Sequence, residues 1–311
     1  MTINILLLLL GFMLLIKGAD VLINGSISFA YKFGISKMVI GLTIVAIGTS
    51  LPELAVSVFS SVDGKSDLLF GNIVGSNIAN ILLILGVSAI FSPLIFKNKT
   101  VKKEIPILIF TSFLLIALIA LFNADHVLNL WRGLPLLAFF VAFVYYVMKI
   151  NHFPIDTAEE YLDKMSKKKS VLLIILGLIG LIVGARFIVS GGTGLAVTFG
   201  ISEAVIGLIV IAIGTSLPEL ATSVIASRKH DHEIVIGNII GSNIINILLI
   251  LGISSMIHPI AVSKNLLFDL YLYAFITIML FVLLIFNKYK ISRYYGVTFI
   301  VIYIIYVIVN I

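Results

Sequence analysis

Long runs of apolar residues follow one another along this chain, separated by short polar segments. A membrane-spanning helix needs about 20 consecutive apolar residues, and ten stretches come close to that length or exceed it. They lie near residues 3–31, 37–61, 68–92, 105–122, 128–148, 170–198, 203–227, 233–257, 266–287 and 292–310. The runs are continuous and do not alternate apolar with polar positions, which excludes a strand barrel. The pattern predicts an all-α membrane protein with ten transmembrane helices.

The second half of the chain repeats the first. Residues 10–94 align with residues 176–260 without a gap, and about half of the aligned positions are identical. The matched residues include Gly, Thr, Ser, Pro, Glu and Asn, so a shared apolar composition does not explain the likeness. Each repeat holds five predicted spans, and this odd number places the second repeat upside down in the membrane. Inverted repeats are typical of secondary transporters, which hold their substrate near the midplane where the repeats meet.

The distribution of basic residues predicts the orientation of the chain. If the N-terminus lies outside, the outer loops hold only Lys65, Arg132 and Lys264, and all other loop Lys and Arg residues face the cytoplasm. That cytoplasmic set is Lys32, Lys37, Lys97, Lys99, Lys102, Lys103, Lys149, Lys164, Lys167, Lys168, Lys169, Arg228, Lys229, Lys288, Lys290 and Arg293. The positive-inside rule therefore places both termini on the extracytoplasmic side of the cell membrane.

Three segments follow from the repeat and the orientation. We expect a first five-helix repeat at residues 1–148, a cytoplasmic linker at 149–169 and a second five-helix repeat at 170–311. The linker is polar and carries mixed charges, and nothing in it indicates chemistry.

Composition supports an intramembrane chain. Hydrophobic residues make up 60% of it and charged residues 12%, with a mean hydropathy of +1.20, whereas soluble domains are about half apolar and a quarter charged. The net charge of +6 comes from loops, so we expect a lipid bilayer around the chain and no nucleic-acid partner. The chain has no cysteine and its histidines lie in or near loops, which disfavours soft metals.

Each repeat carries the motif GTSLPE inside an apolar run, at residues 48–53 and again at 214–219. Pro52 has no N–H, so the carbonyl of Gly48 loses its helical donor. Such a carbonyl is tolerated at membrane depth only where it lines an enclosed or wet site. The Thr and Ser of the motif add hydroxyl oxygens one turn before Glu53, and an ionisable residue inside a membrane indicates function by default. Carbonyl, hydroxyl and carboxylate oxygens together are the ligands that hard cations such as Ca²⁺ and Na⁺ prefer.

A second motif, GN-x-x-GSN-x-x-N, begins at residue 71 and returns at residue 237. Its two glycines, four residues apart, allow another helix to approach closely. The Ser and the last Asn of each motif share a helix face and offer oxygen ligands; they are Ser76, Asn80, Ser242 and Asn246. The other four asparagines are expected to form interhelical hydrogen bonds or to satisfy helix ends rather than to bind a cation; they are Asn72, Asn77, Asn238 and Asn243.

Two copies of GTSLPE, each followed by GN-x-x-GSN-x-x-N, resemble the alpha repeats of the calcium/cation antiporter superfamily, in its prokaryotic sodium/calcium exchanger branch. The resemblance covers nearly the whole chain. It implies that Glu53 and Glu219 are the calcium carboxylates and that Thr49 and Thr215 add backbone carbonyls. For sodium it implies additional ligands, namely the carbonyls of Ala46 and Ala212 with Ser50, Ser216, Ser76 and Ser242, while Asn80 and Asn246 flank the central position. It also implies that two long tilted helices, near 3–31 and 170–198, slide past the bundle to alternate access.

The charge of this site leaves the counter-ion open. Some relatives, including potassium-dependent ones, carry Asp where this chain has Asn246, so two carboxylates remain here. Two negative charges balance one Ca²⁺ or two protons, whereas several sodium ions would leave a net positive site. The Ser and Thr ligands favour sodium, and Asn246 argues against a potassium requirement. We therefore expect a Ca²⁺/Na⁺ antiporter, with a Ca²⁺/H⁺ antiporter using the same glutamates as the alternative.

Two other classes of function fit less well. A cation channel could use the two glutamates, but inverted repeats with broken helices around a closed midplane site suit alternating access better. An intramembrane enzyme would need a group such as HExxH, a Ser–His pair or paired aspartates, and none is present at membrane depth. We expect no enzymatic activity and no cofactor, with inorganic cations as the transported partners.

Overall fold

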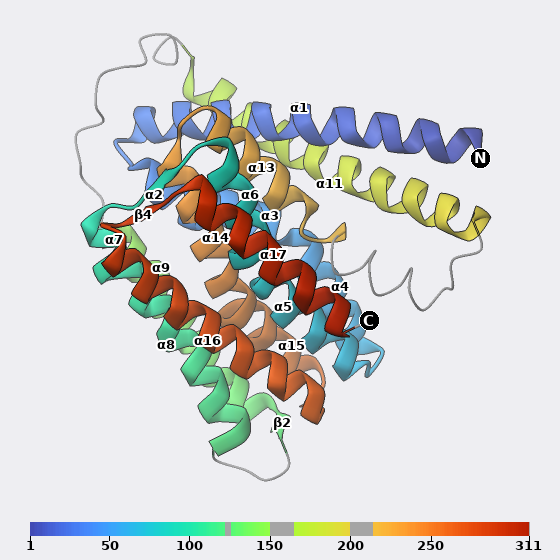
Figure 1. Ribbon diagram of the computed structural model, residues 1–311, viewed down its shortest axis with the longest axis vertical. Coiled ribbons are helices and arrows are strands. Elements are labelled where there is room, and N and C mark those ends of the chain that lie inside the picture. Colours follow the sequence, from blue (N-terminus) through green and yellow to red (C-terminus); the bar gives the residue numbers. More distant parts are fainter. Residues whose placement is uncertain (122–125, 150–164, 200–213, 311) are drawn as a thin grey trace.

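The computed structural model describes residues 1–121, 126–149, 165–199 and 214–310 (Figure 1). The described chain is helical apart from two very short antiparallel ladders in loops, which the apolar pattern did not predict. Strand β1 (Leu94–Ile95) pairs with β4 (Lys290–Ile291), and β2 (Val127–Leu128) pairs with β3 (Ile260–Ala261). Each ladder joins a loop of the first half to a loop of the second half.

Helices of the first half coincide with the predicted spans, and several are divided by short π-helical turns. They are α1 (Thr2–Phe33), α2 (Lys37–Ile40), η1 (Gly41–Val45), α3 (Ala46–Thr49), α4 (Leu51–Val62), α5 (Ser66–Ala79), η2 (Asn80–Ile84), α6 (Leu85–Phe91), α7 (Asn98–Lys102), α8 (Glu104–Ile116), η3 (Ala117–Leu121) and α9 (Leu130–Lys149).

The second half follows the same order. Its described elements are α11 (Lys167–Thr198), α13 (Leu217–Arg228), α14 (His232–Ile245), η4 (Asn246–Leu251), α15 (Gly252–Ile257), α16 (Lys264–Phe286) and α17 (Arg293–Asn310). The predicted span 203–227 is covered only from residue 214 onwards, and most of the predicted linker 149–169 lies outside the described residues.

Among the described residues, seven helical segments are long and apolar enough to cross a membrane. The bent pair Lys37–Thr49 and Leu51–Val62 would make an eighth, and the apolar stretch of α17 is shorter. The segments differ in how much of them is buried inside the protein. Of the most apolar part of each segment, 94% is buried in His232–Ile257 and 78% in Ser66–Phe91, against 28% in α1. The two helices that carry the GN motifs therefore form the centre of the bundle.

Helices α1 and α11 lie side by side and extend beyond the rest of the bundle (Figure 1). They run antiparallel and touch through glycines. A Cβ built on Gly18 would lie 2.8 Å from the backbone nitrogen of Leu181, and one on Gly177 would lie 2.5 Å from that of Leu22. Glycine is required here because any side chain would meet backbone atoms of the other helix. This close contact makes the two long helices one packing unit.

Equivalent residues of the two repeats make equivalent contacts. The Ser61 hydroxyl donates to the carbonyl of Ser254 at 2.7 Å, and the Ser227 hydroxyl donates to the carbonyl of Ser88 at 2.6 Å. The glycines of the second GN motif also behave as predicted, since a Cβ on Gly237 would lie 2.7 Å from the carbonyl oxygen of Met38. In the first GN motif, a Cβ on Gly71 would lie 3.5 Å from a side-chain carbon of Leu266.

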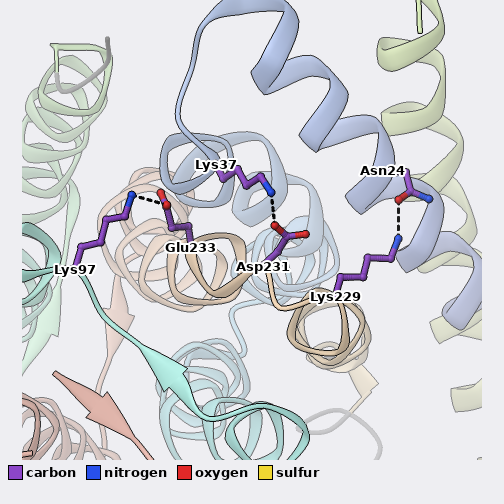
Figure 2. A network of polar contacts seen from close by, with 6 residues as sticks. All are labelled: Asn24, Lys37, Lys97, Lys229, Asp231 and Glu233. Atoms are coloured by element: carbon purple, nitrogen blue, oxygen red, sulfur yellow. Dashed lines mark hydrogen bonds and ion pairs between the residues drawn. The ribbon is translucent and has the colours of Figure 1, made fainter. Parts of the chain in front are cut away.

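The turn between α13 and α14 is held by ion pairs to the first half of the chain (Figure 2). Lys229 Nζ lies 2.5 Å from an Asp20 carboxylate oxygen and 2.6 Å from Asn24 Oδ1 on α1. Lys37 Nζ lies 2.5 Å from Asp231 Oδ1. A third pair joins Lys97 to Glu233 at 2.6 Å. These contacts fix the start of α14, which belongs to the most buried of the described spans, against elements of the other repeat.

The Lys37–Asp231 pair is expected to contribute more to stability than its exposed counterpart. Asp231 is 7% exposed, so Lys37→Met would leave a buried charge without its ion-pair partner and lower the free energy of unfolding by about 2 kcal/mol. The matched control is Lys65→Met, because Lys65 pairs with Asp63 at 3.0 Å in the equivalent turn of the first repeat, with 61% and 55% of the two side chains exposed. Such exposed pairs contribute less than about 1 kcal/mol. Thermal unfolding in detergent compares the two variants, and equal shifts would contradict this ranking.

Candidate cation-binding site

The first GTSLPE motif interrupts a helix at its serine, and the second has the same backbone conformation at its serine. Ser50 separates α3 from α4 with φ −82° and ψ 8°, and the two helices are bent by 47°. Ser216 has nearly the same backbone, with φ −84° and ψ 1°, immediately before α13. Pro52 lies in the first turn of the new helix, where its missing N–H removes no helical hydrogen bond within α4. The break therefore places the carboxylate of Glu53 in the first turn of a helix, where the helix dipole favours negative charge.

The carboxylates of Glu53 and Glu219 are buried and lack basic partners among the described residues. Each side chain is 1% exposed, and Oε2 of each carboxylate has no hydrogen-bond partner in the part of the chain that the structure describes. Within the described part of the chain, no Lys, Arg or His forms an ion pair with either residue. Two carboxylates near one another repel, and a buried charge without a partner is costly. A bound cation would relieve both costs.

Hydroxyl groups lie beside each carboxylate, and at least one of them comes from the opposite repeat. The Ser50 hydroxyl donates to Glu219 Oε1 at 3.0 Å, and the Ser242 hydroxyl lies 3.5 Å from the same oxygen. Glu53 in turn interacts with the hydroxyls of Thr215 and Ser216. Ser50 and Glu219 come from different repeats, so the fold brings the two GTSLPE motifs together as one cluster of oxygen atoms.

The remaining predicted side chains are buried as well. Ser216 and Ser76 are joined by a 3.2 Å hydrogen bond between their hydroxyls. Asn80 and Asn246 are each 1% exposed, and the Oδ1 atom of each has no hydrogen-bond partner. Each asparagine is also the first residue of a π-helical turn, a deviation that is frequent at functional sites. Their free amide oxygens fit a role as neutral cation ligands.

The predicted carbonyl ligands are only partly described. Ala46 and Thr49 are fully buried, and the carbonyl oxygen of Ala46 accepts from the Ser50 N–H at 3.0 Å and lies 3.3 Å from the Thr49 hydroxyl oxygen. That carbonyl therefore keeps a hydrogen bond within its own helix. Ala212, its predicted counterpart, lies outside the described residues.

Donor chemistry distinguishes this cluster from a site for soft metals. Among the residues that the structure describes, no group of three or more His, Cys, Asp or Glu side chains is placed to hold a metal ion. The cluster instead combines two carboxylates with hydroxyls and amides, all of which are oxygen donors. Such a set suits hard cations.

Comparison with known proteins assigns the chain to a family. The family model described as sodium/calcium exchanger protein matches residues 3–149 and 169–311. The chain belongs to the sodium/calcium exchanger family. It is thus a cation antiporter of that family and a multi-pass integral membrane protein, and it is not an enzyme.

Individual relatives align with this chain over most of their own length. The chain is 33% identical, over an alignment 348 positions long, to the sodium/calcium exchanger MaX1 of Methanosarcina acetivorans, covering 99% of this chain and 98% of the relative. It is 42% identical to the putative antiporter CaxA of Alkalimonas amylolytica, over 81% of this chain and 80% of that one. A solved structure of the sodium-calcium exchanger NCX_Mj superposes with a TM-score of 0.86 at 34% identity, covering 98% of both chains.

Two observations about this exchanger could have been predicted more fully from its sequence. The asparagines Asn72 and Asn238 do form the interhelical hydrogen bonds predicted for them. Their partners, which are the equivalent threonines Thr215 and Thr49, were not identified from the sequence. The glycines that join α1 to α11 recur every seven residues in both repeats, at 11, 18 and 25 and at 177, 184 and 191. That regular spacing is the signal that could have identified the helix–helix contact.

Proposed function

We propose that this exchanger transports Ca²⁺ in exchange for Na⁺ by alternating access at a site near the membrane midplane. The observation that supports this most is the cluster around Glu53 and Glu219, which are buried, come from different repeats and have no basic partner among the described residues. Two such carboxylates match the charge of one Ca²⁺. Surrounding hydroxyl and amide oxygens would replace part of the hydration shell of the cation.

Each side chain has a definite role in this proposal. Glu53 and Glu219 supply charge and bind both kinds of cation, and the backbone carbonyls of Thr49 and Thr215 complete the calcium shell. Sodium ions add further ligands, which are Ser50, Ser216, Ser76, Ser242 and the carbonyls of Ala46 and Ala212. Asn80 and Asn246 flank the central position with their free amide oxygens. Calcium and sodium would share the carboxylates, so one kind of cation must leave before the other binds.

The proposal includes the arrangement in the membrane. Ten transmembrane helices would form two inverted five-helix repeats, at residues 1–148 and 170–311, joined by a cytoplasmic linker at 149–169, with both termini outside. The distribution of Lys and Arg supports this orientation. The glycine contact between α1 and α11 supports movement of these two helices as one unit past the bundle.

The names of the relatives support the choice of ions. MaX1 is a sodium/calcium exchanger, and the NCX_Mj crystals were soaked with Na⁺, Ca²⁺ or Sr²⁺. Those ions belong to the relatives. For this chain, the Ser and Thr hydroxyls beside both carboxylates favour sodium as the counter-ion.

Calcium uptake into proteoliposomes tests the counter-ion. Vesicles loaded with sodium and diluted into sodium-free medium are expected to accumulate calcium, even with a protonophore present, because the sodium gradient drives the exchange. Vesicles with choline in place of sodium are the control and are expected to accumulate little. Uptake that ignores the sodium gradient but follows a pH gradient would replace this proposal with the Ca²⁺/H⁺ alternative. Uptake that needs no counter-ion would indicate a channel.

A further inference from the structure

Asn72 connects the two repeats next to the candidate site. It is buried in α5, and its Oδ1 accepts a hydrogen bond from the Thr215 hydroxyl of the other repeat at 3.3 Å. Its Nδ2 donates to the Ser57 hydroxyl at 3.3 Å and lies 3.5 Å from the carbonyl oxygen of Glu53, both on α4 of its own repeat. One amide thus joins the threonine of one GTSLPE motif to the helix that carries the glutamate of the other.

Asn238 makes the equivalent contacts in the second repeat. It is fully buried in α14, and its Oδ1 accepts from the Thr49 hydroxyl at 3.1 Å. Its Nδ2 donates to the Ser223 hydroxyl on α13 at 3.1 Å. The same hydrogen-bonded chain, from threonine through asparagine to serine, therefore occurs twice. Both copies cross the boundary between the repeats.

This arrangement requires the amide of asparagine. The side chain must accept on one side and donate on the other, and a carboxylate could only accept. A third carboxylate would also add charge beside Glu53 and Glu219. Each of these two Asn oxygens accepts a hydrogen bond from a threonine hydroxyl, whereas the side-chain oxygens of Asn80 and Asn246 have no hydrogen-bond partner among the described residues.

We propose that Asn72 and Asn238 are positioning residues, each of which fixes the ligand threonine of the opposite repeat relative to the glutamate helix of its own repeat. The inference rests on the proposed function, in which the Thr49 and Thr215 carbonyls bind calcium. A hydrogen bond to a threonine side chain restricts the backbone of the same residue, and so sets the direction of its carbonyl. Partners of this kind, one step removed from the ion, typically change metal affinity about 10- to 100-fold when they are removed.

The test measures cation binding to the purified full chain in detergent. The melting temperature is followed while CaCl₂ is titrated in sodium-free buffer, and the concentration that gives half of the stabilisation is determined. Asn72→Ala and Asn238→Ala are each expected to raise that concentration about 10- to 100-fold. A purely structural role would instead lower the melting temperature without calcium and leave the half-saturating concentration unchanged.

A double-mutant cycle isolates the shared hydrogen bond. Thr215→Val keeps the shape of the side chain and removes the hydroxyl, so it is expected to weaken calcium binding to a similar degree. The double variant Asn72→Ala/Thr215→Val is expected to be weakened by less than the sum of the two single effects, because the Asn72–Thr215 contact is already lost in each single variant. Thr215→Ser keeps the hydroxyl and is expected to bind calcium as the wild type does. If Asn72→Ala does not fold, the comparison of Thr215→Val with Thr215→Ser still tests the role of the hydroxyl.

Asn243→Ala is the matched control. Asn243 lies on α14 with Asn238 and is equally buried, but its Nδ2 donates to the carbonyl of Ile239 in its own helix, at 2.6 Å. Its removal is expected to leave the half-saturating concentration within about twofold of the wild type, since no contact between the repeats depends on its side-chain donor.

The outcomes separate this inference from the proposed function. If calcium does not stabilise the wild type at all, the proposed calcium site fails, and the positioning role fails with it. If calcium stabilises the wild type and binds Asn72→Ala and Asn238→Ala equally well, the site stands and the positioning role is overturned. Fully additive effects in the cycle would also overturn it, because Asn72 and Thr215 would then act separately.

Discussion

Glu53→Gln and Glu219→Gln are each expected to abolish calcium transport. Both carboxylates are 1% exposed and have no basic partner among the described residues, so each would be a main source of charge for a divalent cation. Glutamine keeps the shape and one oxygen but removes the charge. Removing one member of a buried charge pair costs about 3–5 kcal/mol, which corresponds to a loss of at least about 100-fold in cation affinity. Sodium-dependent calcium uptake into proteoliposomes measures the effect.

Glu104→Gln provides the matched control for a buried glutamate outside the cluster. Glu104 is 2% exposed at the start of α8, and one of its carboxylate oxygens accepts from the Tyr146 hydroxyl at 2.8 Å. We expect this variant to retain calcium uptake. Size-exclusion profiles establish whether each variant is folded. Wild-type uptake by both site variants would contradict the assignment of the two carboxylates.

Gly177→Ala is expected to separate the two long helices. An added Cβ would lie 2.5 Å from the backbone nitrogen of Leu22 and 2.7 Å from its Cα, and no change of rotamer moves backbone atoms. Overpacking of this kind costs about 1–3 kcal/mol. Because α1 and α11 are proposed to move as one unit, calcium uptake is expected to fall along with the melting temperature in detergent.

Gly192→Ala on the same helix isolates the effect of the close contact. An added Cβ there meets no described atom within 4 Å. Both substitutions replace glycine by a better helix former, which favours the helix by about 1 kcal/mol. We therefore expect Gly192→Ala to be as stable as the wild type or more stable. If the two variants melt at the same temperature, the glycine contact does not hold the helices together.

Much of the fold could be predicted from local sequence, because membrane insertion depends on local composition. The span 68–92 illustrates this, since Ser66–Phe91 is a continuous helical segment with π-helical residues in its middle. Helix interruption at GTSLPE also follows from local chemistry, through the missing N–H of Pro52. The π-helical turns that begin at Asn80 and Asn246 could not be predicted, because apolar periodicity does not distinguish a single wider turn from an ordinary one.

The ion pairs of the α13–α14 turn could not be predicted either. Lys229 and Asp231 occupy the positions that Asp63 and Lys65 hold in the first repeat, so the repeat alone suggests another local pair. In the structure, Lys229 pairs with Asp20. Asp231 pairs with Lys37, as Figure 2 shows. These partners are distant in sequence, and only the packing of the helices brings them together.

The amino-acid sequence by itself determined that this is a helical membrane protein, that its halves are repeats, and that Glu53 and Glu219 are the ionisable residues shared by both motifs. Only the tertiary structure decided which groups of one repeat meet those of the other. In it, the Ser50 hydroxyl donates a hydrogen bond to Glu219, and the Thr215 hydroxyl donates one to Asn72. The physical reason is that hydrophobicity and backbone chemistry act over a few residues, whereas contacts between the repeats depend on how whole helices pack.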